Sequence, residues 1–185
     1  DPDGHHLAED VALVVGRAFD QALGDRLAVL MGGRLRQQGS PEEVFSSPSS
    51  EEVAAFVGVE NILAGRVDRQ SGGVATVAVG SNHVSVVGGH ALGEKLVVGI
   101  RPEAVVLEAQ ARQGVVTSAL NRLSGTVERI TPLGPLARVT VDCGFPLVSL
   151  ITGQSVENLS LSPGAGVVAS FKASAVHVIR RESGR

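Results

Sequence analysis

The chain has 185 residues, a net charge of −3, and 43% hydrophobic but only 3% aromatic residues. This length suits one ordinary domain or two small ones, and the hydrophobic fraction is enough to build a core. The negative charge and the scarcity of aromatic side chains argue against nucleic-acid binding, which depends on cationic surfaces and base stacking. A single cysteine, Cys143, excludes an intrachain disulfide and any site built from several cysteines.

The first 58 residues alternate short strands with short helices. Strands are expected at 11–15, 26–30 and 35–38, with a helical segment at 19–23. Gly32 and Gly33 form a hairpin turn signal because a type I′ turn needs positive φ at both positions. Ser40 and Glu43 predict a capping box at the start of one helix, and Ser49 predicts the cap of a second helix that ends before Gly58.

After residue 60 the pattern changes to short valine-rich runs separated by glycine, which is typical of small β-barrels. The expected strands are 62–69, 74–79, 84–87, 95–100 and 104–107, followed by 124–131, 137–141, 147–151, 166–171 and 176–179. A short helix is expected at 154–159, and a polar linker at 108–117. The hydropathy pattern contains no apolar run of the roughly 18 residues that a membrane span needs.

These two sets of strands resemble each other. Residues 61–67 (NILAGRV) and residues 121–127 (NRLSGTV) both follow the pattern Asn-x-Leu-x-Gly-x-Val. The spacing predicts an internal duplication with a period of about 60 residues. We therefore expect a mainly β protein with two five-stranded barrels of the oligonucleotide/oligosaccharide-binding (OB) type.

Several segments carry a family resemblance. Residues 25–45 (DRLAVLMGGRLRQQGSPEEVF) resemble the end of an ABC-transporter nucleotide-binding domain. Residues 98–103 (VGIRPE) are similar to a motif of the transport-associated OB (TOBE) domain that follows it in importer ATPases. Residues 118–127 (SALNRLSGTV), 150–159 (LITGQSVENL) and 171–176 (FKASAV) resemble the Mop-type molybdate-binding domain. The chain thus resembles the C-terminal part of a molybdate/tungstate importer ATPase subunit.

This resemblance implies three parts. Residues 1–58 would be a small α/β remnant of the ABC ATPase domain, residues 59–110 a first OB-like (TOBE) barrel, and residues 116–181 a second, Mop-type barrel. The sequence contains no Gly-x-x-x-x-Gly-Lys-[Ser/Thr] phosphate loop, no ABC signature loop and no switch histidine after the strand at 11–15. We therefore expect no catalytic residues and no ATP hydrolysis by this chain. A working ATPase would require a further N-terminal part.

The resemblance also implies a set of oxyanion donors, since a tetrahedral dianion needs hydroxyls, backbone N–H groups and positive charge. The family binds its oxyanion between barrels at a subunit interface. Carried over by motif, the donors are Ser118, Asn121, Lys172, Ser174 and the backbone N–H of Ala173, while Ser149 and Thr152 lie where a partner barrel would contribute hydroxyls. The usual family arginine is replaced by Leu120, and Arg122, two residues further on, would point the same way in a strand and is the candidate substitute.

No metal site is expected, because His83, His90 and His177 are scattered without ligand spacing. The ligand implied by the resemblance is molybdate or tungstate, bound by a homodimer that controls transport through trans-inhibition. The implied partners are the membrane permease subunits of an importer, with no nucleic acid. The expected location is the cytoplasm, with peripheral association at the inner face of the membrane. The alternative is a ligand-free dimerisation module of an importer ATPase for another solute, such as a sugar, a polyamine or iron.

Overall fold

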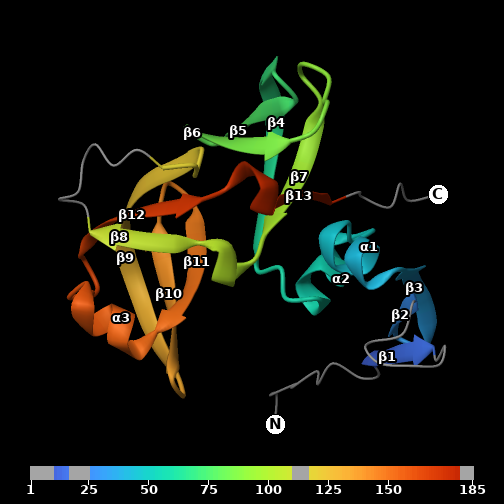
Figure 1. Cartoon of the computed structure of the whole chain (residues 1–185), viewed down its shortest axis with the longest axis horizontal. Helices are drawn as coiled ribbons and strands as arrows, with labels where there is room; N and C mark the ends of the chain where they lie inside the picture. The colour runs from blue at the N-terminus through green and yellow to red at the C-terminus, as the bar shows by residue number, and fades with distance from the viewer. Residues whose placement is uncertain (1–10, 17–25, 110–116, 180–185) are drawn as a thin grey trace, which may run out of the picture. The chain divides into compact units, whose positions relative to one another are not determined.

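The chain folds into a small α/β unit and a larger unit of strands and short helical turns (Figure 1). The computed structural model describes residues 11–16, 26–109 and 117–179. The first unit comprises residues 1–57 with 179–185, and the second comprises residues 58–178. The mainly β architecture expected from the sequence is confirmed.

The first unit contains an antiparallel sheet in the order β1-β2-β3. Its strands are β1 (Val11–Gly16), β2 (Arg26–Met31) and β3 (Arg34–Gly39). Gly32 and Gly33 have φ values of 56° and 68°, so the predicted hairpin turn uses the conformation that favours glycine. The helical segment expected at 19–23 lies outside the described residues.

Two short helices follow, α1 (Pro41–Ser46) and α2 (Glu51–Phe56). The predicted capping box is confirmed: Ser40 Oγ accepts from the N–H of Glu43, and the Glu43 carboxylate accepts from the N–H of Ser40. The prediction for the second helix was wrong by one residue, because Ser50 and not Ser49 accepts from the N–H of Val53. The N–H of Ser49 instead donates to the side chain of Gln37 on β3.

The second unit is built from two repeats with the same order of elements. The first repeat contains β4 (Asn61–Ser71), β5 (Val74–Val79), β6 (Asn82–Val87), β7 (Lys95–Ile100), η1 (Pro102–Ala104) and β8 (Val106–Ala109). The second contains β9 (Asn121–Leu133), β10 (Leu136–Asp142), β11 (Pro146–Thr152), α3 (Gly153–Asn158), β12 (Gly166–Phe171), η2 (Ala173–Ala175) and β13 (Val176–Ile179). Over their first eleven residues β4 and β9 share one alternation of buried and exposed positions, which confirms the duplication.

Each repeat gives its last strand to the other repeat's sheet. The sheet orders are β11-β10-β9-β12-β8 and β13-β7-β4-β5-β6, so β8 of the first repeat pairs with β12, and β13 of the second pairs with β7 (Figure 1). The turns before the exchanged strands also cross over, with η1 contacting β11 and η2 contacting β6. A strand had been expected at 104–107, but residues 102–104 form η1 and β8 begins only at Val106.

The exchange gives both sheets one common hydrophobic core, which includes Val77, Val84 and Ile100 from one sheet and Val139 and Phe171 from the other.

The glycine of the repeated motif is needed where neighbouring strands approach closely. A Cβ at Gly125 would lie 2.6 Å from the carbonyl oxygen of Asp142, and one at Gly65 would collide with the equivalent carbonyl of Ala78. These approaches lie beside the β-bulges at which the β4–β5 and β9–β10 registers shift.

Two equivalent asparagines link the repeats through side-chain hydrogen bonds. Asn61, at the start of β4, accepts from the N–H of Val148 at 2.6 Å and donates to the carbonyl of Val148 at 2.9 Å. Asn121, at the start of β9, makes the same pair of bonds to the backbone of Ser85, at 2.6 and 3.0 Å. Both asparagines are only 2% exposed, so their side-chain amides provide hydrogen-bond partners for backbone groups that are shielded from water.

We expect Asn61→Ala and Asn121→Ala each to lower the free energy of unfolding by about 2–3 kcal/mol, because each leaves a backbone N–H and a carbonyl without their partners. The measurement is urea unfolding followed by circular dichroism, with the exposed Asn158→Ala as the matched control. An Asn121→Ala variant as stable as the control would show that Asn121 does not hold the repeats together.

Candidate functional site

The predicted donors fall into two groups, on or next to strands of the sheet β11-β10-β9-β12-β8. Asn121 pairs with Phe171, and Arg122 with Ser170, across the antiparallel β9–β12 ladder. The ladder ends at the Asn121–Phe171 pair, with Leu120 directly before β9 and Lys172 directly after β12. Lys172 is also the N-cap of η2 (Ala173–Ala175), so the turn that carries the predicted donors begins where the β9–β12 pairing ends.

Ser149 and Thr152 lie elsewhere, on β11, which is separated from β9 by β10. Ser149 is fully buried, and its hydroxyl donates to the carbonyl of Val105 at 2.6 Å. Thr152 is the N-cap of α3 and accepts from the N–H of Ser155. Within one chain these two hydroxyls are not part of the group around Lys172, and their assignment to a partner's site stays a prediction.

Exposure separates the residues of the first group. The side chains of Ser118, Lys172 and Ser174 are exposed, whereas Ala173 is buried and Asn121 is engaged with Ser85. Lys172 has no ion-pair partner among the described residues. An unpaired lysine beside exposed hydroxyls is suited to a small anion, because the ammonium supplies charge and the hydroxyls supply directed hydrogen bonds.

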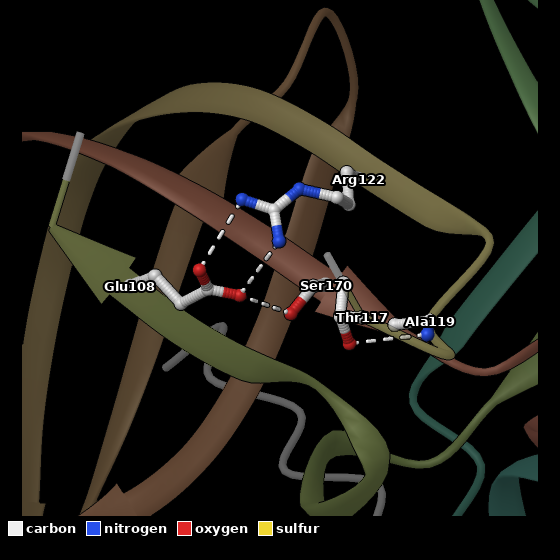
Figure 2. Close-up of polar contacts among 5 residues, drawn as sticks. All are labelled: Glu108, Thr117, Ala119, Arg122 and Ser170. Atoms are coloured by element: carbon white, nitrogen blue, oxygen red, sulfur yellow. Dashed lines mark hydrogen bonds and ion pairs between the residues drawn. The ribbon is translucent and has the colours of Figure 1, made fainter. Parts of the chain in front are cut away.

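Arg122 is already paired within the chain (Figure 2). Its two terminal nitrogens donate to the two carboxylate oxygens of Glu108, each at 3.2 Å, which is a bidentate ion pair. The hydroxyl of Ser170 donates to the same carboxylate at 2.8 Å. The cluster thus spans three neighbouring strands, β9, β12 and the exchanged strand β8.

The first repeat provides an internal comparison for the turn at Lys172. Arg101, Pro102 and Glu103 stand between β7 and β8 where Lys172, Ala173 and Ser174 stand between β12 and β13. Proline has no N–H to donate, and a glutamate carboxylate repels an anion where serine offers a hydroxyl. The equivalent turn of the first repeat is therefore poorly suited to an oxyanion.

Sequence reasoning missed Glu108 and Ser170. Glu108 fell within the expected linker at 108–117, but it lies in β8 and reaches Arg122 only because that strand is exchanged. A comparison of the two repeats could have singled out this position. When η1 and η2 are aligned, Glu108 corresponds to Ile179 of the second repeat, so a charged residue stands where the other repeat has an apolar one.

A groove of ≈ 780 Å³ opens elsewhere on the second unit, between the start of β4 and strands β9, β10 and β11. It contains the ion pair of Arg138 with Glu60 at 2.8 Å, as well as Glu128 and Arg129. The two arginines are balanced by two glutamates, so the groove offers no excess positive charge to a dianion. None of the predicted donors lines it.

Cys143 and His177 are two described side chains whose pKa values are shifted by their surroundings. Burial, with a smaller effect from Asp142, raises the pKa of Cys143 to about 11, so the thiol stays protonated and unreactive at neutral pH. Burial and the charge of Arg101 lower the pKa of His177.

Among the described residues, no group of three or more His, Cys, Asp or Glu side chains could hold a metal ion. No helix in the described part of the chain is long and apolar enough to cross a membrane.

Residues 117–178 match the TOBE domain. The chain is 39% identical over 170 residues to the molybdate/tungstate import ATP-binding protein WtpC of Pyrococcus horikoshii, a match that covers 90% of this chain and 46% of that protein. It is 31% identical over 121 residues to the spermidine/putrescine import ATP-binding protein PotA of Thermobifida fusca, covering 64% of this chain and 30% of that protein. The chain therefore spans less than half the length of these relatives.

A solved structure of the cytoplasmic molybdate-binding protein ModG, with molybdate bound, matches the fold with a TM-score of 0.60 and 28% sequence identity. The match covers 66% of this chain and 96% of the ModG chain. The resemblance to the C-terminal part of a molybdate/tungstate importer ATPase subunit, seen first in the motifs, is thereby confirmed, as is the OB-type fold.

We expect Ser149→Ala to lower the free energy of unfolding by about 1–2 kcal/mol, because it removes the donor to the Val105 carbonyl in a fully buried place. Ser174→Ala is the matched control and should change stability by less than about 0.5 kcal/mol, since its side chain is exposed. Urea unfolding curves give both values. Equal stability of the two variants would contradict a structural role for Ser149.

Proposed function

We propose that the second unit is a non-catalytic regulatory module that binds molybdate or tungstate. The bound oxyanion would lie beside residues 172–174 and the segment 118–122. The observation that carries this proposal is the pairing of Asn121 with Phe171 at the end of β12, because the exposed Lys172 follows this pair directly and Ser174 lies in the turn that comes next. The likeness to WtpC and ModG supports molybdate or tungstate as the ligand.

The contrast between the repeats supports one site in each chain. Lys172, the N–H of Ala173 and the hydroxyl of Ser174 form a donor set that Arg101, Pro102 and Glu103 do not reproduce. One lysine balances only half the charge of a dianion, and further donors are needed for a stable complex. A second copy of the chain, contributing the exposed Thr152 across an interface, would supply a further donor, so we propose a homodimer with the oxyanion between its subunits.

In a complete importer the module would act as a feedback sensor. Oxyanion that has accumulated in the cytoplasm would bind between the modules of two ATPase subunits and favour a dimer state that does not transport. Such trans-inhibition is a coupling between ligand binding and the conformation of the dimer. The partners would be a second ATPase subunit and the membrane permease subunits, which would bring the module to the cytoplasmic face of the membrane.

A second candidate is a ligand-free dimerisation module in an importer for another solute. Two observations favour it. Leu120, which is 61% exposed, replaces the family arginine, and Arg122 is paired with Glu108 instead of being open to a ligand. The similarity to a spermidine/putrescine import protein is consistent with this alternative.

We expect isothermal titration of the purified chain to show one tungstate or molybdate bound per chain, with no binding of sulfate. Lys172→Ala should weaken binding by about thirty-fold or more, the effect expected when one partner of a desolvated charge pair is removed. Lys95→Ala, which removes the only other lysine, is the matched control and should leave the affinity unchanged.

Absence of heat with all three anions, from a folded and dimeric chain, would refute the oxyanion proposal and favour the dimerisation module. Light scattering on the same samples measures whether the chain is a dimer. An equal loss of affinity in the two lysine variants would place the anion somewhere other than the turn at Lys172.

A further inference from the structure

We propose that Glu108 is an internal competitor for the bound oxyanion. In the ligand-free chain it holds the guanidinium of Arg122, and anion binding transfers that guanidinium from the carboxylate to the oxyanion. Arg122 would then perform the task of the arginine that Leu120 replaces, but only after Glu108 has been displaced. This inference rests on the proposed oxyanion site.

The strand register connects Arg122 to the turn at Lys172. Arg122 pairs with Ser170 on the β9–β12 ladder, and Lys172 follows two residues after Ser170, one position beyond the last ladder pair, with its backbone still extended. Side chains two residues apart along extended backbone lie on the same face. On an antiparallel ladder, diagonal neighbours have Cα atoms about 7–8 Å apart, a separation that long side chains can bridge.

The present partner of Arg122 is able to leave. Glu108 lies on β8, the edge strand of its sheet, and both partners of the ion pair are partly accessible, with side chains 27% (Arg122) and 22% (Glu108) exposed. When released, the carboxylate can turn towards water and keeps the option of a hydrogen bond from Ser170. The exchange therefore replaces one charge-assisted pair by another and leaves no ion buried without a partner.

The competition between Glu108 and the anion sets a threshold for binding. An oxyanion must bind the Arg122 guanidinium more strongly than the Glu108 carboxylate does. A dianion can do so, because it attracts a guanidinium more strongly than a carboxylate of single charge does. The other sheet, β13-β7-β4-β5-β6, holds no such cluster, since Ile62, Gly99 and Ile179 occupy the positions equivalent to Arg122, Ser170 and Glu108. The competitor is thus confined to the sheet whose β12 leads into the proposed donor set.

The test is titration of the full chain with tungstate, comparing wild type with Glu108→Gln, a substitution that keeps the shape of the side chain. We expect tungstate affinity to rise roughly ten-fold, the scale of a hydrogen bond to a charged group freed from competition. The rise should vanish in Glu108→Gln/Arg122→Ala, because the gain comes from Arg122. Ser170→Ala, which loosens Glu108 but keeps its charge, should give a smaller rise and serves as the second variant.

Glu60→Gln is the matched control, because it breaks the comparable ion pair with Arg138 and removes the same charge from the same unit. Its affinity should equal that of wild type. An unchanged or lower affinity in Glu108→Gln, or a rise that persists without Arg122, would overturn the inference while leaving the oxyanion site standing. Failure of wild type and Glu108→Gln alike to bind tungstate would instead refute the proposed function itself.

Discussion

The second unit depends on each repeat completing the other. Asn61 and Asn121 sit at equivalent strand starts, and each bonds the backbone of a strand in the opposite repeat. The exchanged strands β8 and β13 then close the two sheets in the same reciprocal way. Because the hydrophobic core draws on both sheets, neither repeat can bury its apolar face without the other. The two OB-like sheets therefore form one structural module.

This mutual dependence also shapes the candidate site. Strands β9 and β12 of the second repeat pair with each other, while the exchanged strand β8 brings Glu108 from the first repeat against Arg122. A module built from two like halves thus has two equivalent turns with different residues, and we propose that only the turn at Lys172 carries oxyanion donors. Duplication gives both repeats the same fold. A few differences in sequence, such as Pro102 in place of Ala173 and Glu103 in place of Ser174, distinguish their two turns.

Most of the individual strands could be predicted from the sequence, because glycine punctuation, valine-rich runs and capping signals act over a few residues. Errors occurred where neighbouring residues offer the same local signal, as with Ser49 and Ser50, or where a turn resembles a strand start, as at residues 102–104. The strand exchange was not predicted, because β8 and its partner β12 are separated by more than fifty residues and no local pattern encodes their pairing. For the same reason, the motif showed that Asn61 and Asn121 are related but did not show what they bind.

The proposed donor set around Lys172 could be assigned only through the resemblance, and the structure adds that Lys172 directly follows the last pair of the β9–β12 ladder. We propose that this turn, and not its counterpart in the first repeat, receives the oxyanion. Anomalous diffraction at the tungsten absorption edge, from crystals of the chain grown with tungstate, locates the bound anion. One strong peak per chain is expected beside Lys172 and Ser174. A map with no peak there, or with an equal peak beside Arg101 and Glu103, would contradict it.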